Sequence, residues 1–183
     1  MQATDGNLGA HLATLENAAY VAIAKDFVGD IDRIDTTVIK KLLDNGLMPV
    51  ISPLSADDQG TLLNINGDTV AAAIGAALSA EKLMLCTSAP GILERVDDPS
   101  SIISYTDLNG LKSLRDEKKI VDGMLPKAKA IEDAIRGGVR RVHVMSYKSP
   151  EGILAEVFTN EGAGTLIVAD VNALSPAEQL VDK

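Results

Sequence analysis

Short apolar runs alternate along the chain with segments of helical periodicity, and this alternation constrains the fold more than any other feature. Between Thr36 and Asn45 apolar residues recur at helical spacing, and Gly46 follows where a helix C-cap belongs. Further helices are predicted over 69–80, 106–114, 126–136 and 150–158, and strands over 47–54, 82–87, 139–145 and 164–168. Such spacing is typical of βαβ units. The sequence therefore predicts an α/β fold, with a mainly parallel open sheet and helices on both faces.

The segment 5–35 is less regular than the rest of the chain. A turn is predicted at Asp5-Gly6-Asn7, and strands are predicted over 20–24 and 27–31. Because the chain contains no internal repeat, low-complexity run or Pro/Ser-rich linker, we expect a single domain over 1–183.

Charge and apolar run length restrict the classes of partner. The chain has 17 Lys and Arg against 26 Asp and Glu, and its net charge of −9 argues against a nucleic-acid partner. No apolar stretch approaches the ~18 residues of a membrane span, so no membrane partner is expected. Cys86 is the single cysteine, so the chain cannot form an internal disulfide. The sequence also shows no positively charged start followed by an apolar run, the pattern of a secretory signal. We therefore expect a cytoplasmic protein.

The first candidate site is the run from Asn64 to Asp68 (NINGD), which directly precedes the helix predicted over 69–80. The amides of Asn64 and Asn66 and the carboxylate of Asp68 stand beside the free N–H groups of a helix start, which suits a polar or anionic ligand. Asp68 is the predicted N-cap. The alternative is an ordinary capping loop, in which Asp68 only satisfies the first turn.

The second candidate site is Lys127, in the run DGMLPK. Pro126 fits the first helical position, which places Lys127 in the first turn, where the helix dipole disfavours a cation by ~0.3–1 kcal/mol. This placement is tolerable if an anion such as a nucleotide phosphate lies in front of the helix. The alternative is a solvated lysine.

The third candidate site is the pair Thr87 and Ser88, at the end of the strand predicted over 82–87. Ligands of open α/β sheets bind at the carboxyl ends of the strands, so these hydroxyls are placed to contact one. The alternative is an ordinary turn, in which hydroxyl residues are common.

Four motifs occur in the order NINGD, LCTSAPGIL, VDGMLPKAKAIEDAIRGGVRRVHV and FTNEGAGTLI. Their order and spacing resemble the carboxyl-terminal half of the N-acetylglutamate kinases, which belong to the amino-acid kinase family. ATDGNLGAHLA and DFVGDID also resemble the family's middle region. Ser88 stands where the family usually has Asp, and Asp122 where Gly is common. The resemblance implies an amino-acid-kinase-like fold whose N-terminal lobe, with its glycine-rich phosphate loops, is missing.

The resemblance also implies a role for each matched residue. Asp68 and Lys127 match catalytic positions: the carboxylate organises the catalytic lysines, and Lys127 stabilises the transferring phosphoryl group. Asn64 and Asn66 match substrate-binding positions. The matched nucleotide contacts are Thr87, Ser88, Gly123 and Met124.

The activity that the resemblance implies is ATP-dependent phosphorylation of the side-chain carboxylate of N-acetyl-L-glutamate, a step of arginine biosynthesis, with ATP and Mg²⁺ as cofactors. Two alternatives stay open: a non-catalytic nucleotide-binding or regulatory module, and a kinase lobe that needs a separate N-terminal lobe. The expected protein partner is a second copy of the chain or a complementing N-terminal lobe.

Overall fold

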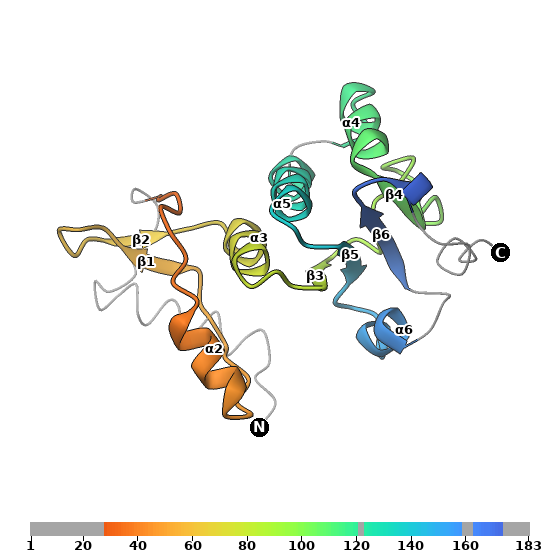
Figure 1. Ribbon diagram of the computed structural model, residues 1–183. Coiled ribbons are helices and arrows are strands. Elements are labelled where there is room, and N and C mark those ends of the chain that lie inside the picture. The colour runs from red at the N-terminus through yellow and green to blue at the C-terminus, as the bar shows by residue number, and fades with distance from the viewer. Residues whose placement is uncertain (1–27, 121–122, 159–162, 174–183) are drawn as a thin grey trace.

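The computed structural model describes residues 28–120, 123–158 and 163–173 (Figure 1). The described helices are α2 (Thr37–Asp44), α3 (Gly67–Ala77), α4 (Leu108–Asp116), α5 (Met124–Arg136), α6 (Gly152–Phe158) and the 3₁₀ turn η2 (Val171–Ala173). The described strands are β1 (Leu54–Ala56), β2 (Leu62–Asn64), β3 (Lys82–Thr87), β4 (Tyr105–Asp107), β5 (Arg141–Ser146) and β6 (Gly164–Val168).

Four of these strands form a sheet in the order β3-β5-β6-β4. β3 pairs with β5 in parallel, from Lys82 opposite Arg141 to Thr87 opposite Ser146. β4 pairs with β6 in parallel, and β5 pairs with β6 in antiparallel orientation. Two of the three pairings are thus parallel, and the predicted α/β fold with a mainly parallel sheet is confirmed.

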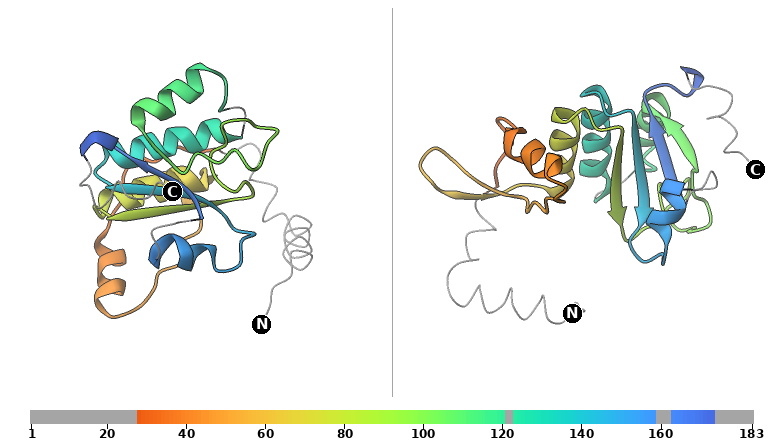
Figure 2. Two further views of the ribbon diagram at one scale, coloured as in Figure 1. Left: turned by 90° about the vertical axis from the view of Figure 1, so that its right-hand side faces the viewer. Right: turned by 60° about the horizontal axis from the view of Figure 1, so that its bottom comes forward.

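Helices cover both faces of this sheet, as predicted. α3, α4 and α5 lie on one face and α6 lies on the other (Figures 1 and 2). Alternate residues of the strands point to the two faces, and Leu85, Val142, Val144 and Ile167 pack under α3, α4 and α5 in the main core. Ile131 of α5 is fully buried there. The core is aliphatic because the chain has few aromatic residues.

α2 and the β1–β2 hairpin extend away from the sheet on the far side of α3 (Figure 1). α2 is amphipathic but buries none of its residues, and Gly46 ends it in the left-handed conformation (φ +73). Asp57 closes the hairpin, because its Oδ1 accepts hydrogen bonds from the backbone N–H groups of Gln59 and Thr61 at 3.0 and 2.8 Å. These hydrogen bonds form the turn between β1 and β2.

The strand predicted over 47–54 is wrong for all but its last residue, Leu54. Met48 and Val50 are 87% and 94% exposed, although the run is almost wholly apolar. A strand needs a hydrogen-bonding neighbour as well as an apolar composition, and no described strand pairs with 47–53. The apolar composition of 47–53 indicates a tendency to be buried, but it does not show whether a neighbouring strand is available for pairing.

Other predicted elements differ from the structure mainly at their ends. The strands over 82–87 and 164–168 are confirmed residue for residue, and the strand predicted over 139–145 is β5. β4 was not predicted, because its residues 106 and 107 were assigned to the start of a helix. That helix begins only at Leu108, and Asp107 is its N-cap. The strand predicted over 27–31 is reduced, in its described part, to one bridge between Val28 and Asn64. The turn at 5–7 and the strand over 20–24 lie outside the described residues.

Candidate functional site

Asp68 and Lys127 meet across 59 positions of sequence. The Lys127 Nζ donates to both carboxylate oxygens of Asp68, at 2.7 and 2.8 Å. The side chain of Lys127 is 10% exposed and that of Asp68 is 27% exposed. Such a two-oxygen contact with a shielded ammonium group holds Lys127 in a defined position.

The fold brings the two residues together because α3 and α5 begin at the same edge of the sheet. Each helix leads into the strand that it covers, so it runs opposite to that strand. β3 and β5 are parallel, and therefore the N-termini of α3 and α5 both lie at the carboxyl ends of these strands. α3 also packs directly against α5. Asp68 is the second residue of α3 and Lys127 the fourth residue of α5.

Asn66, and not Asp68, is the N-cap of α3, which corrects the prediction. The Asn66 Oδ1 accepts from the backbone N–H groups of Asp68 and Thr69, at 2.9 and 3.2 Å. Asn66 has the extended backbone of an N-cap, whereas Asp68 is already inside the helix. Because Asn66 does the capping, the carboxylate of Asp68 is available to hold Lys127.

Lys127 is not a solvated lysine. The residue is only 8% exposed. The negative charge of Asp68 offsets the unfavourable interaction between the Lys127 cation and the start of the helix. α5 begins two residues earlier than predicted, at Met124, so that Pro126 is the third helical residue and not the first. Lys127 nevertheless stays within the first turns of the helix, where its charge faces the N-terminus of α3.

The first turn of α5 has backbone donors that no described side chain caps. Its N-cap is Gly123, and space is open where a Cβ would be added at this residue. Met124 is half-buried and packs against the main core. Free N–H groups at a helix start suit an anion, so Gly123 and Met124 occupy a position compatible with their predicted role in nucleotide binding.

Thr87 and Ser88 lie at the same edge, at the carboxyl end of β3. The Thr87 carbonyl accepts from the backbone N–H of Tyr147 at 2.9 Å, which ties the ends of β3 and β5 together. Thr87 is half-buried and Ser88 is exposed. Asn64 ends β2, is exposed, and accepts through its backbone oxygen from the Gly29 N–H at 3.1 Å.

Among the described residues, side-chain hydrogen bonds join three of the predicted site residues: Asp68 with Lys127, and the Asn66 Oδ1 with the backbone N–H of Asp68. The others share the edge of the sheet through topology alone.

Sequence reasoning missed Thr165, which also organises this edge. Thr165 is fully buried in β6, and its Oγ1 accepts from the backbone N–H of Ile92 at 2.8 Å. A Cβ added at Gly91 would lie 2.7 Å from the same oxygen, so a glycine is needed beside it. Both residues stand in the motifs LCTSAPGIL and FTNEGAGTLI, whose Gly and Thr were the available signal.

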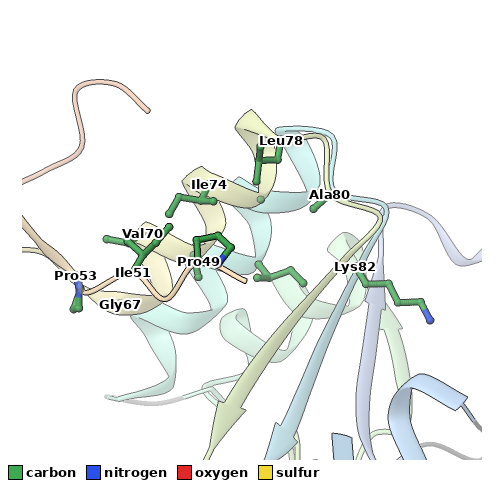
Figure 3. Close-up of a pocket in the computed structure, with 12 residues that line it drawn as sticks. Pro49, Ile51, Pro53, Gly67, Val70, Ile74, Leu78, Ala80 and Lys82 are labelled. Atoms are coloured by element: carbon green, nitrogen blue, oxygen red, sulfur yellow. The ribbon is translucent and has the colours of Figure 1, made fainter. Parts of the chain in front are cut away.

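A separate groove, lined by neither Asp68 nor Lys127, lies beside α3 (Figure 3). Its volume is ≈ 370 Å³, and Val70, Ile74 and Leu78 of α3 line it together with the segment 49–53. Among its lining residues only Lys82 is charged, and in Figure 3 the Lys82 ammonium points away from α3. A nucleotide needs several polar and cationic partners, so this groove does not fit one.

Within the described part of the chain, no helix combines the length and the apolar composition needed to cross a membrane.

The sequence matches known kinases over most of its length. The profile of the amino acid kinase family covers residues 7–146. The acetylglutamate kinase of Myxococcus xanthus is 47% identical over 150 residues, which are 82% of this chain and 48% of the relative. The chloroplastic acetylglutamate kinase of Arabidopsis thaliana is 43% identical over 141 residues, which are 77% of this chain and 41% of the relative.

Solved structures share the same fold. N-acetylglutamate synthase from Neisseria gonorrhoeae, complexed with coenzyme A and L-arginine, superposes with a TM-score of 0.73 at 26% identity, over 79% of this chain and 33% of that chain. Carbamate kinase from Giardia lamblia bound to AMP-PNP superposes with a TM-score of 0.60 over 93% of this chain and 58% of that chain. The carbamate kinase is only 17% identical, so it supports the fold alone.

The resemblance to the N-acetylglutamate kinases is thus confirmed at the level of sequence and fold. The chain spans about half the length of the curated relatives that it matches. The family profile covers well over half of the chain, through the described elements α2 to β5. The chain therefore belongs to the amino acid kinase family.

Proposed function

We propose that this chain provides the nucleotide-binding and phosphoryl-transfer half of a kinase that phosphorylates the side-chain carboxylate of N-acetyl-L-glutamate with ATP, in cytoplasmic arginine biosynthesis. The observation that carries the proposal is the contact of Lys127 with Asp68 at the carboxyl edge of the sheet, in a chain with acetylglutamate kinase relatives. The ammonium is shielded, held in place, and next to the start of α5, whose N–H groups no described side chain caps.

This arrangement suits phosphoryl transfer to a carboxylate. The acceptor carboxyl group of a glutamate side chain has an ordinary pKa of ~4.3, so it is ionised at neutral pH and needs no general base. Catalysis then depends on positioning two anions and on neutralising the charge that develops on the phosphoryl oxygens. Lys127 supplies a fixed positive charge, and the N–H groups of the first turn of α5 supply further donors.

Asp68 fits a positioning role for the charged groups. Its two oxygens accept hydrogen bonds from the Lys127 ammonium. The negative charge of Asp68 would also favour a Mg²⁺ ion nearby. Mg²⁺ in such sites is held largely by phosphate oxygens and water, with one or two carboxylates, and it neutralises phosphate charge when bound. Among the described residues no group of three or more His, Cys, Asp or Glu side chains that could hold a metal ion is present. We propose that the nucleotide phosphates and water supply most of the ligands of the ion.

Asn64 and Asn66 are proposed to face the acetylglutamate. Asn66 uses its Oδ1 to cap α3, so the Asn66 amide is oriented beside Asp68. Asn64 is exposed at the end of β2, and its side-chain amide is proposed to supply donors and an acceptor to the substrate. Amide groups pair with carboxylate and amide oxygens of a small polar substrate without adding charge to the site.

The proposed partner is a second lobe that completes the site. The chain spans about half the length of its curated relatives. The arm formed by α2, the segment 47–53 and the β1–β2 hairpin exposes apolar residues such as Met48 and Val50. Large exposed apolar patches mark surfaces that bind another protein surface. The same surface could pair two copies of this chain, and the activity experiment separates the two arrangements.

Release of ADP from MgATP and N-acetyl-L-glutamate tests the proposal. We expect turnover when the chain is mixed with the N-terminal half of a related acetylglutamate kinase, and a rate at least ~10²-fold lower from the chain alone. Asp68→Asn keeps the size of the side chain but removes its charge, and should abolish most of the restored turnover. Turnover in the mixture that is unaffected by Asp68→Asn would contradict the assigned site, and a dimer that is fully active alone would contradict the need for a second lobe.

A further inference from the structure

His143 and Glu156 form a buried pair on the face of the sheet opposite the main core. The His143 Nδ1 lies 2.6 Å from the Glu156 Oε1, and the two side chains are only 7% and 4% exposed. β5 carries His143 and α6 carries Glu156. Burying a carboxylate costs free energy unless its oxygens accept hydrogen bonds. The buried His143–Glu156 pair therefore requires donors at fixed positions around the carboxylate.

The second oxygen of Glu156 reaches the start of β6. The Glu156 Oε2 accepts a hydrogen bond from the backbone N–H of Ala163, the residue before β6 begins. One carboxylate thus joins three elements: α6 through its own backbone, β5 through His143, and β6 through Ala163. The backbone at the start of β6 is fixed by this side chain.

The start of β6 lies at the edge where the nucleotide is proposed to bind. β6 runs antiparallel to β5, so its first residues lie beside the carboxyl end of β5, with Gly164 opposite Met145. The next residue, Thr165, accepts from the Ile92 N–H at 2.8 Å and so holds the turn that follows β3. That turn begins with Thr87 and Ser88, the proposed nucleotide contacts.

We propose that Glu156, oriented by His143, is a positioning residue for the nucleotide site: it fixes the start of β6, and Thr165 transmits that position to the turn after β3. This inference rests on the proposed function, because it assigns Glu156 and Thr165 to the same nucleotide edge. Neither residue is proposed to contact the phosphates. Their effect is on the backbone that carries the contacts.

Nucleotide affinity and amide exchange in the full chain test this positioning role. Glu156→Gln preserves shape but removes the charge, whereas Glu151→Gln removes a charge from an exposed residue just before α6. We expect Glu156→Gln to weaken MgATP binding about tenfold and to speed hydrogen exchange of the Ala163 amide about tenfold, the effect of losing one charge-assisted hydrogen bond. Glu151→Gln should leave both quantities at the wild-type values.

Substitutions of Thr165 test the same positioning role independently, even if Glu156→Gln fails to fold. Thr165→Val is nearly isosteric but cannot accept from Ile92, and should weaken MgATP binding, whereas Thr165→Ser keeps the hydroxyl and should bind as wild type does. A purely structural role would lower the melting temperature of Thr165→Val without this difference in affinity between folded proteins.

The outcomes distinguish this inference from the proposed function. If the wild-type chain binds MgATP and both Glu156→Gln and Thr165→Val bind it equally well, the positioning role is overturned and the proposed function stands. If the wild-type chain binds no MgATP, the proposed function fails and the positioning role fails with it. Faster exchange of the Ala163 amide with unchanged MgATP affinity would also overturn the inference, because the backbone change would not reach the site.

Discussion

Asn66 and Asp68 have separate roles at the start of α3, so the cap can be tested without disturbing the charge that holds Lys127. Asn66→Ala removes the acceptor of two backbone N–H groups and should lower the free energy of unfolding by about 1 kcal/mol. Asn66→Asp should be nearly neutral, since Asp caps about as well as Asn. Urea denaturation of the three proteins checks this. Equal losses in both variants would show that the amide, and not its oxygen, is needed.

Acid should weaken the fold partly through Glu156. Burial raises the pKa of this carboxyl, but hydrogen bonds from His143 and from the N–H groups of Ala163 and Gly164 lower it, and its pKa lies below the ordinary 4.5. Because the folded-state pKa is below the unfolded-state pKa, the stabilisation is complete above about pH 4.5 and is lost as pH falls through the folded-state pKa.

The melting temperature should therefore fall less steeply on acidification in Glu156→Gln than in the wild type, between about pH 6 and about pH 3. Other carboxyls with lowered pKa values are the same in both proteins, so the difference between the two curves reports the Glu156 carboxylate together with its contact to His143. Parallel curves would contradict the assigned hydrogen bonds.

Single residues of the site could be located from sequence, but not all of their contacts. Asp68 and Lys127 were both singled out, yet only the packing of α3 on α5 shows that they touch. Asp68 was assigned as the cap because Asn and Asp both cap well, and local composition does not decide between positions 66 and 68. Thr165 stands in one of the four motifs, but the motif does not reveal its contact, since its partner Ile92 is 73 positions away.

At the scale of elements, the close approach of α3 and α5 depends on Gly137. A Cβ at this residue would lie 2.5 Å from the Ala76 Cβ and 3.0 Å from the Asp133 backbone oxygen. Gly137→Ala should therefore destabilise the fold by about 1–3 kcal/mol, the usual cost of overpacking.

Gly67→Ala is the matched control for this substitution, because nothing lies within 4 Å of a Cβ added there and its φ is not positive. It should be neutral or stabilising by up to ~1 kcal/mol. Thermal and urea unfolding measure both variants. A Gly137→Ala protein as stable as Gly67→Ala would mean that the two helices can move apart at no cost.

Elements with a clear period and clear end signals were predicted well, and those that depend on a neighbour were not. β3 and β6 each contain a short apolar run, LMLC and LIV, and turn residues follow or precede the strand, so their bounds were predicted correctly. β4 has only three residues and exists because it pairs with β6. The antiparallel direction of β6 was also unpredicted, since an apolar run carries no information about strand direction.

At the scale of the whole molecule, the arm formed by α2, the segment 47–53 and the β1–β2 hairpin presents apolar residues to solvent. We expect the isolated chain to self-associate through this surface. Val50→Asp should reduce that association while leaving the free energy of unfolding within about 0.5 kcal/mol of wild type, because Val50 is 94% exposed.

Sedimentation velocity over a range of protein concentrations measures this association. Gln59→Asp adds the same charge to an exposed residue of the hairpin turn and serves as the control. It should associate like the wild type. Equal association of Val50→Asp and the wild type would place the contact surface elsewhere.

We expect the edge of the sheet that holds Lys127 to bind the phosphates of MgATP. The most direct test of this binding is a calorimetric titration of MgATP into the wild-type chain, Lys127→Met and Lys129→Met. Lys127 and Lys129 share α5, but Lys129 is 73% exposed and pairs with Asp133 on the outer side of the helix. We predict at least a tenfold loss of affinity in Lys127→Met, about the effect of one lost charge-assisted contact, and no change in Lys129→Met. Wild-type affinity in Lys127→Met would show that Lys127 does not bind the phosphates.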